Sequence, residues 1–411
     1  MTERYDVVVV GAGPCGSRAA LEAAERGCDV LVLEKGAEIG VPKQCAEGIS
    51  HQGLEDAGIE PRDEWISQEI ESFTIFAPNG EELHVIPPDG GYVLERKLFD
   101  KWLAAEAAKA GAEIRVNSPV IDVVKEEGRV KGVVVDTPSG PEVVEAEVVI
   151  AADGIESRVA RAAGLAEPLD PDDMCTCAQY EMVGVDLEDE HSLYFFVDLE
   201  WFPGGYFWIF PKSGGRANVG LGIRGTESDP GRAKEILDRA IEEHPVISEL
   251  VGEAKVLELN VGGVPVSGPI ERTYDDGIMV VGDAARQVNP LTGGGLHSGM
   301  VCARIAGEVA AEAVEEGDAS ASVLKRYEKE WRKELKRYDF LKEVCETLRK
   351  MDNEALNRLA EALDDETLMA IVSGKGRKKA LMRLAKELKS DPSSVSKFGS
   401  LLIKYVMKTG W

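Results

Sequence analysis

The sequence lacks the features of two large classes of protein. No stretch approaches the ~18 to 20 consecutive apolar residues that a membrane-spanning helix needs, and the N-terminus runs directly into a predicted strand without the layout of a signal peptide. Basic charge is scarce, because 47 Lys and Arg stand against 74 Asp and Glu and give a formal net charge of -27. Nucleic-acid binding needs a basic face, so this composition argues against it. We expect a cytoplasmic protein that is at most peripheral to the inner face of the membrane.

Cysteine is sparse and shows no pairing pattern. The seven cysteines are spread widely along the chain, and only Cys175 and Cys177 lie close together. An odd, scattered set predicts no disulfide framework. No second pair and no histidine stands at the spacing of a zinc site, so we predict no metal and interpret the pair as part of an alternating strand.

A glycine-rich turn follows the first predicted strand. Residues 4–10 are β-branched and apolar through their second half, and Gly11, Gly13 and Gly16 come directly before an alanine-rich helix. The first glycine permits the tight turn, the second lets a pyrophosphate approach the backbone, and the third lets the helix pack on the sheet. A second strand ends in Glu34, where a carboxylate can accept both hydroxyls of an adenosine ribose. We predict a dinucleotide-binding βαβ unit.

Later segments indicate that the dinucleotide is FAD. A buried strand ends on Gly282-Asp283, and the loop 289–295 then leads into a helix. This pairing resembles the segment of large flavoproteins in which the aspartate holds the ribityl chain. Asp153-Gly154 and Arg96 resemble the DG motif and the flavin-proximal arginine of the para-hydroxybenzoate hydroxylase superfamily. The alternative for Arg96 is a surface helix charge.

Between about residues 170 and 270 the sequence pattern changes to short strands of alternating apolar and polar residues, as in an antiparallel sheet. Strand alternation places Tyr206, Trp208 and Phe210 on one face. This aromatic face could line an apolar tunnel beside the flavin, or it could be the ordinary core face of the sheet.

Two motifs resemble the geranylgeranyl reductase family. Tyr-x-Trp-x-Phe-Pro at 206–211, followed by Gly220-x-Gly222, is similar to its signature. Residues 41–48 resemble its cysteine-containing loop near the flavin. A glycine often follows the cysteine in that family, whereas this chain has Ala46, which leaves the backbone geometry of the loop open. The resemblance runs from the first strand to about residue 340.

The predicted fold is α/β, with three parts. A Rossmann-type FAD-binding domain with a doubly wound parallel sheet takes residues 1–60, 90–168 and 272–318. An inserted antiparallel-sheet substrate domain takes residues 61–89 and 169–271. A helical domain takes residues 319–411.

The resemblance also implies the site residues. The candidate catalytic residues are Cys45, Tyr206 and Trp208. The residues implied to contact FAD are Gly11, Gly13, Pro14, Cys15, Gly16, Glu34, Lys35, Cys45, Ala46, Arg96, Val120, Asp153, Gly154, Gly282, Asp283, Gly293, Gly294, Gly295 and Leu296.

Archaeal members of the family saturate the geranylgeranyl chains of membrane glycerophospholipids, which implies that reaction here. An isolated alkene has no carbonyl to polarise it, so a proton must lead or accompany the hydride from flavin N5, and a general acid is needed. Cys45, Tyr206, His297 and a bound water are the candidates, although helix packing is an alternative role for His297. Cys45 could instead pair with Cys302, whose alternative role is that of a small buried helix residue.

Two other functions fit the flavin motifs. One is an FAD-dependent monooxygenase of the same superfamily, and the other is a non-catalytic flavin- and lipid-binding subunit that passes electrons. The external electron donor also stays open between ferredoxin, a deazaflavin and NAD(P)H.

The C-terminal tail differs in charge from the rest of the chain. Residues 374–411 hold ten basic and two acidic residues, and Phe398, Leu401, Leu402, Tyr405 and Val406 stand at helical spacing. This helix could lie on an anionic lipid surface. Alternatively, it docks on the acidic body of the protein.

Overall fold

A computed structural model describes residues 3–364, 367–368, 370, 376–389 and 395–409. Its larger sheet contains five parallel strands in the order β18-β11-β1-β2-β8. Their bounds are β1 (Glu3–Val10), β2 (Val30–Leu33), β8 (Glu113–Arg115), β11 (Gly140–Ala151) and β18 (Ile278–Val280). Antiparallel additions are β17 (Tyr274–Asp275) beside β18, β10 (Arg129–Thr137) beside β11, and β9 (Val120–Glu126) beside β10. The predicted α/β fold is confirmed.

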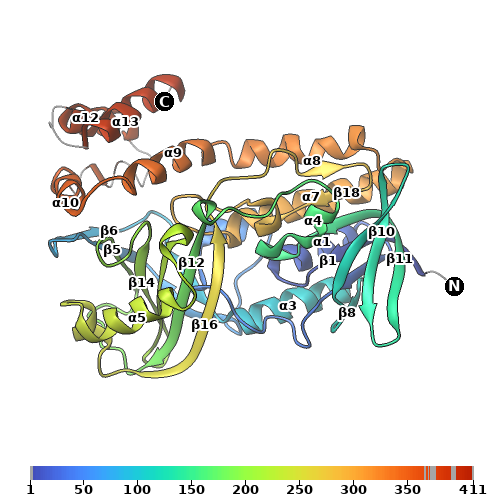
Figure 1. Ribbon diagram of the computed structural model, residues 1–411, viewed down its shortest axis with the longest axis horizontal. Helices are drawn as coiled ribbons and strands as arrows, with labels where there is room; N and C mark the ends of the chain where they lie inside the picture. The colour runs from blue at the N-terminus through green and yellow to red at the C-terminus, as the bar shows by residue number, and fades with distance from the viewer. Residues whose placement is uncertain (1–2, 365–366, 369, 371–375, 390–394, 410–411) are drawn as a thin grey trace.

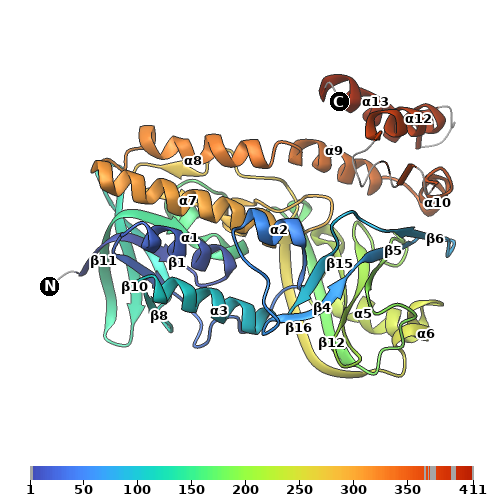
Figure 2. The ribbon, with the colours of Figure 1, turned by 180° about the vertical axis from the view of Figure 1, so that it is seen from behind.

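Both faces of this sheet are covered. Alternate residues of β1 lie in different core clusters: Val7 and Val9 pack on the helical side, and Val8 and Val10 pack on the other. The helical side holds α1 (Pro14–Glu25), α7 (Leu296–Glu316) and α8 (Ala321–Glu334), and α3 (Arg96–Lys109) packs against α1. The second side is covered by the β9–β10 ribbon and the short α4 (Arg158–Ala162). Figure 1 and Figure 2 show α7 and α8 running together along one side of the molecule.

The second sheet has seven strands in the order β16-β12-β15-β14-β13-β5-β6. Their bounds are β5 (Ser72–Phe76), β6 (Glu82–Val85), β12 (Met174–Val183), β13 (Ser192–Phe196), β14 (Tyr206–Lys212), β15 (Arg216–Arg224) and β16 (Lys255–Pro265). All pairs are antiparallel except β13 with β5. Helices α5 (Arg232–Glu243) and α6 (Ile247–Val251) cover one face. The predicted antiparallel character therefore holds apart from one parallel pair.

A small antiparallel sheet joins the two larger ones. It contains β3 (Gly48–Ser50), β7 (Gly91–Leu94) and β4 (Ile66–Ile70), with α2 (His51–Asp56) directly after β3. Short 3-10 turns lie at Gly154–Glu156, Pro171–Asp173, Gly225–Glu227 and Gly282–Ala285. The chain returns through β7 to α3, which brings Arg96 back beside the cysteine loop.

The C-terminal part is helical, as predicted. It contains α9 (Tyr338–Leu348), α10 (Asn353–Glu361), α12 (Arg377–Lys389) and α13 (Val395–Thr409). Phe398 and Leu402 are buried in one cluster with residues of α9, α10 and α12, and Leu401 packs against it. This packing supports the docked-helix alternative, while the side chains of Tyr405 and Val406 lie outside the described residues. Every helix in the described part of the chain is too short or too polar to span a bilayer.

Candidate FAD and substrate site

The glycine turn lies where neighbouring parallel strands end. Because β18, β11, β1 and β2 are adjacent, their carboxyl ends share one edge of the sheet. A Cβ on Gly11, whose φ is 99°, would lie 2.5 Å from the carbonyl oxygen of Ala152, and one on Gly16 would lie 1.8 Å from that of Gly11. A Cβ on Gly13 would meet nothing within 4 Å. Gly11 and Gly16 therefore serve close backbone packing, whereas Gly13 faces free space at the N-terminus of α1.

Glu34 and its neighbours border this turn. The Glu34 carboxylate accepts hydrogen bonds from the backbone N–H groups of Ala12 (2.8 Å) and Gly36 (2.7 Å). Lys35 forms an ion pair with Glu156 at 3.1 Å, which connects the end of β2 to the DG segment. Val120 is buried in the core at the start of β9, so only its backbone remains for a cofactor contact.

Asp153 has an unused hydrogen-bond acceptor. One carboxylate oxygen accepts from the N–H of Val159 at 2.9 Å, and the other is buried with no partner among the described residues. Burial raises the pKa of Asp153 despite the backbone N–H groups that lower it. Orphaned buried acceptors of this kind are rare in proteins and point to an absent donor. The unpaired Asp153 oxygen and the open space at Gly13 are both suited to a bound dinucleotide, so these residues fit FAD.

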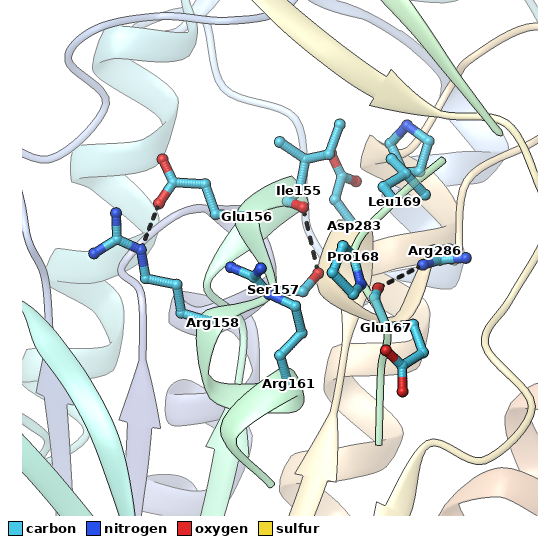
Figure 3. A pocket seen from close by; sticks show the side chains of 11 residues that line it. Ile155, Glu156, Ser157, Arg158, Arg161, Glu167, Pro168, Leu169, Asp283 and Arg286 are labelled. Carbon is cyan, nitrogen blue, oxygen red and sulfur yellow. Dashed lines mark hydrogen bonds and ion pairs between the residues drawn. The ribbon is translucent and has the colours of Figure 1, made fainter. Parts of the chain in front are cut away.

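A cavity of ≈ 180 Å³ lies beside the DG segment, and Figure 3 shows its lining. Arg158, Arg161 and Arg286 bring positive charge to it, and Asp283 and Glu167 bring negative charge. Arg286 donates a hydrogen bond to the carbonyl oxygen of Glu167 at 3.0 Å. The cavity connects the residues after the DG motif with the predicted ribityl-binding aspartate.

Asp283 is packed closely by neighbouring residues, as is Gly282 before it. Burial raises its pKa to about 6, and the charge of Arg96 acts in the opposite direction. The sulfur of Cys15 fills the space beside Gly282, where a Cβ would approach it to 2.7 Å. Gly295 lies equally close, since its Cβ would lie 3.0 Å from an Asp283 oxygen. Gly293 and Gly294 precede it in the loop, and Leu296 begins α7.

Arg96 is not a surface charge. It begins α3, its side chain is 15% exposed, and its guanidinium binds both carboxylate oxygens of Asp100 at 2.7 and 2.9 Å. Burial lowers the pKa of Arg96, but the charge of Asp100 and its hydrogen bonds outweigh this effect and raise that pKa overall. Arg96 lies close enough to Asp283 and Cys45 to interact with them electrostatically, and its position beside the flavin stays a prediction.

The cysteine loop packs on the aromatic face. Gln179 on β12 donates to the carbonyl oxygen of Cys45 at 3.0 Å and accepts from the indole N–H of Trp208 at 2.9 Å. Ala46 packs in one cluster with Trp208 and Phe210. The Gln179 side chain therefore connects Cys45 and Trp208, two of the three candidate catalytic residues.

Tyr206 extends the contact to the loop before α7. Its hydroxyl donates to the carbonyl oxygen of Thr292, and its ring lies 5.8 Å from that of Trp208. Burial raises the pKa of Tyr206, and Cys177 adds to this effect more than Cys175 and Cys345 do. The predicted alternation is confirmed, because Phe207 and Ile209 lie in the opposite cluster with α5.

Six charged side chains, two of them from the cysteine loop, form a cluster in which four are buried and two, Glu95 and Arg216, are partly exposed. This ion cluster consists of Lys43, Glu47, Glu95, Glu181, Lys212 and Arg216. Burial would raise the pKa of Glu181, but Lys43 and Lys212 outweigh it and lower that pKa to about 2. Burial likewise opposes the charge of Lys43, yet Glu47 and Glu181 raise its pKa. Glu181 and Lys43 therefore remain ionised at neutral pH.

Sequence reasoning missed this cluster and Gln179. Lys43 and Glu47 belong to the cysteine-loop motif and Lys212 directly follows the aromatic motif, but their charges drew no prediction. Gln179 and Glu181 were polar residues in the mainly apolar second half of their strand, which was the available indication.

Two candidates lie elsewhere. His297 pairs with Asp56 at 2.9 Å at the contact of α2 with α7, which favours the packing role. Cys302 is fully buried in the core cluster of the larger sheet, and it and Cys45 are both free thiols.

Known proteins share this architecture along nearly the whole chain. The family model for an FAD binding domain matches residues 4–338. A protein of Methanopyrus kandleri named digeranylgeranylglycerophospholipid reductase 2 is 59% identical, with 97% of this chain and 100% of that protein covered. A protein of that name from Methanocaldococcus jannaschii is 42% identical, over 98% and 99%. The chain belongs to the geranylgeranyl reductase family.

A crystal structure agrees with this membership. The geranylgeranyl bacteriochlorophyll reductase-like protein of Thermoplasma acidophilum is 36% identical, with a TM-score of 0.86 and coverage of 98% of this chain and 100% of that one. The chondrochloren halogenase, at 21% identity and a TM-score of 0.70, shares the fold alone. As a geranylgeranyl reductase, the chain is an FAD-dependent oxidoreductase.

Proposed function

We propose that this geranylgeranyl reductase saturates double bonds in the geranylgeranyl chains of a digeranylgeranylglycerophospholipid. The names of its relatives support this substrate. The observation that carries the proposal is the contact of the Cys45 loop with the aromatic face, through Gln179, beside Arg96 and Asp283.

Bound reduced FAD supplies a hydride to one alkene carbon. The protein must orient the alkene, exclude water and deliver a proton to the other carbon. Tyr206, Trp208 and Phe210 offer an apolar surface against which a branched hydrocarbon can be held. The reaction adds two hydrogens to each double bond, and an external donor returns two electrons.

We assign the role of general acid, the group that protonates the alkene, to Cys45. The thiol gives its proton to the alkene carbon, and the thiolate left behind lies in the field of the Arg96 guanidinium. The N–H of Glu47 also donates to the sulfur at 3.2 Å. Tyr206 is less suited, because its hydroxyl proton is engaged by the carbonyl oxygen of Thr292.

A single-turnover experiment tests the reaction. The FAD-loaded protein is reduced with dithionite under anaerobic conditions and mixed with a digeranylgeranylglycerophospholipid. Mass spectrometry should show two mass units gained per double bond, and Cys45→Ala should slow this about 100-fold or more if Cys45 is the general acid. Oxygen-dependent addition of an oxygen atom would instead identify a monooxygenase, and unchanged lipid would leave an electron-transfer role.

Membrane contact and the cytoplasmic location remain predictions, and exposed apolar side chains favour a contact near the cysteine loop. This apolar rim consists of Val41, Leu98, Leu257, Leu259 and Val261. Lys97 pairs with Glu258 at 2.6 Å and Gln44 donates to the carbonyl oxygen of Val261 at 3.1 Å, which connects the three segments. The register pairs Leu259 with Tyr180 and Val261 with Ala178, so both rim side chains lie on the α5 side of the edge strand, and a lipid chain bound there would reach Cys45 around that edge.

Vesicle flotation tests the rim against the tail. Leu257→Ser with Leu259→Ser should lower binding to phosphatidylglycerol vesicles at least threefold. The matched control is Ile121→Ser with Val143→Ser, two comparably exposed apolar residues on the β9–β10–β11 side. If truncation after Ser390 abolishes binding while the rim variant leaves it unchanged, the basic tail is the contact.

The donor also remains a prediction. Stopped-flow reduction of the flavin by ferredoxin, a reduced deazaflavin and NAD(P)H in parallel should identify the class that reduces it within the turnover time.

A further inference from the structure

Glu47 differs from the other members of the ion cluster because its carboxylate reaches several parts of the site. One oxygen accepts from Lys212 on β14 at 2.7 Å, from Asn218 on β15 at 2.7 Å and from Lys43 at 3.1 Å. The other accepts from the backbone N–H of Arg96 at 2.7 Å. Glu47 is 1% exposed. Its side chain thus joins the cysteine loop to the aromatic strand and to the start of α3.

The backbone of Glu47 is also unusual. Its φ is 76°, in the left-handed region that few residues other than glycine adopt. In this conformation its N–H donates to the Cys45 sulfur at 3.2 Å. Strained conformations persist only where surrounding contacts hold them. The four donors on the Glu47 carboxylate provide such contacts.

Asn218 strengthens the same connection. Its amide donates both to the Glu47 carboxylate and, at 3.1 Å, to the carbonyl oxygen of Ala46, and it accepts from Lys43 at 3.2 Å. It is fully buried. The backbone of the loop is therefore held at Cys45 by Gln179, at Ala46 by Asn218 and at Glu47 by its own side chain.

We propose that Glu47 is a positioning residue for Cys45. The Glu47 carboxylate holds the loop in the conformation that directs the Cys45 thiol to its place beside Arg96. The importance of this for catalysis rests on the proposed function. The geometric claim concerns the thiol alone and can be tested without any lipid.

Glu181 offers a matched control. It binds Lys43, Lys212 and Arg216, so its removal disturbs the same ion cluster. In the described part of the chain it makes no hydrogen bond to residues 44–46. A general loss of charge balance and a loss of positioning can therefore be separated.

The experiment measures alkylation of Cys45 by iodoacetamide in the FAD-loaded protein, resolved from the other cysteines by peptide mass spectrometry. Glu47→Ala should raise the rate at Cys45 at least fivefold, because the loop is released and the thiol gains access to solvent. Glu181→Gln should change it less than twofold. Asn218→Ala, which removes no charge, should raise it at least twofold.

Equal effects of Glu47→Ala and Glu181→Gln, or no effect of either, would overturn the proposal. If Glu47→Ala does not fold, Asn218→Ala compared with Glu181→Gln decides in the same way. The parallel turnover assay separates the two ideas. A wild-type protein that leaves the lipid unreduced counts against the proposed function, whereas the alkylation contrast still decides the role of Glu47.

Discussion

The glycine turn and the cysteine loop are built in different ways. The turn uses backbone geometry within one βαβ unit, with Gly11 and Gly16 packed against carbonyl oxygens and Gly13 left open. The loop is held by the side chains of Gln179 on β12, Lys212 on β14 and Asn218 on β15. The backbone N–H of Arg96, at the start of α3, adds a fourth contact. A site of the first kind is readable from one short segment, whereas a site of the second kind exists only after distant strands have assembled.

The energetics differ in the same way. In the turn, the absence of a side chain matters, and an added Cβ at Gly11 or Gly16 is a steric cost. In the loop, charge balance matters, because ionised groups buried together stabilise one another only while each has its partner. Two predictions test this contrast and a third concerns Asp283, in order from the largest expected effect to the smallest.

Gly16→Val should prevent formation of the folded, flavin-bound protein. A Cβ 1.8 Å from a carbonyl oxygen cannot be relieved by a side-chain rotation, so the helix must separate from the sheet at a cost of about 3 kcal/mol or more. Absorbance of bound flavin after purification gives the measurement. Gly13→Ala is the control, since nothing lies within 4 Å, and it should fold normally while retaining less FAD. A stable Gly16→Val holoprotein would contradict the steric account.

Lys212→Met should lower the free energy of unfolding by about 3 kcal/mol, because it leaves Glu47 and Glu95 without their shared buried partner. Denaturant unfolding measures this. Lys212→Met combined with Glu47→Gln should recover part of the loss, because charge balance returns. If the double variant is as unstable as the sum of the singles, the cluster does not act through paired charges.

Asp283 should make the stability of the flavin-free protein depend on pH. Burial raises its pKa from 3.8 to about 6, so the folded state binds the proton more tightly than the unfolded state. Its stabilising contribution is present at low pH and declines as pH rises through 6. Relative to Asp283→Asn, the wild type should lose roughly 1 kcal/mol between pH 5 and pH 7.5. If the free energies of unfolding of the two proteins change equally with pH across this range, the raised pKa of Asp283 is refuted.

Much of the fold followed from local pattern. The apolar first strand, the glycine spacing and Glu34 predicted the βαβ unit, and the alternation at 206–210 predicted which aromatic residues share a face. The helical tail was predicted from its periodicity and docking on the body was one of its two alternatives, but the residues it packs against were not predicted. Burial of Phe398 against α10 and α12 depends on partners that no local pattern identifies.

By itself, the sequence determined where the dinucleotide turn lies and which aromatic residues share a face of the sheet, because steric limits on glycine and the period of a strand act between near neighbours. Only the tertiary structure decided how the motifs meet. The Glu47 carboxylate finds Lys212, 165 positions away along the chain, and Gln179 joins Cys45 to Trp208. Buried charges and hydrogen bonds need partners within about 3 Å, and which residues come that close is decided by the packing of the sheets.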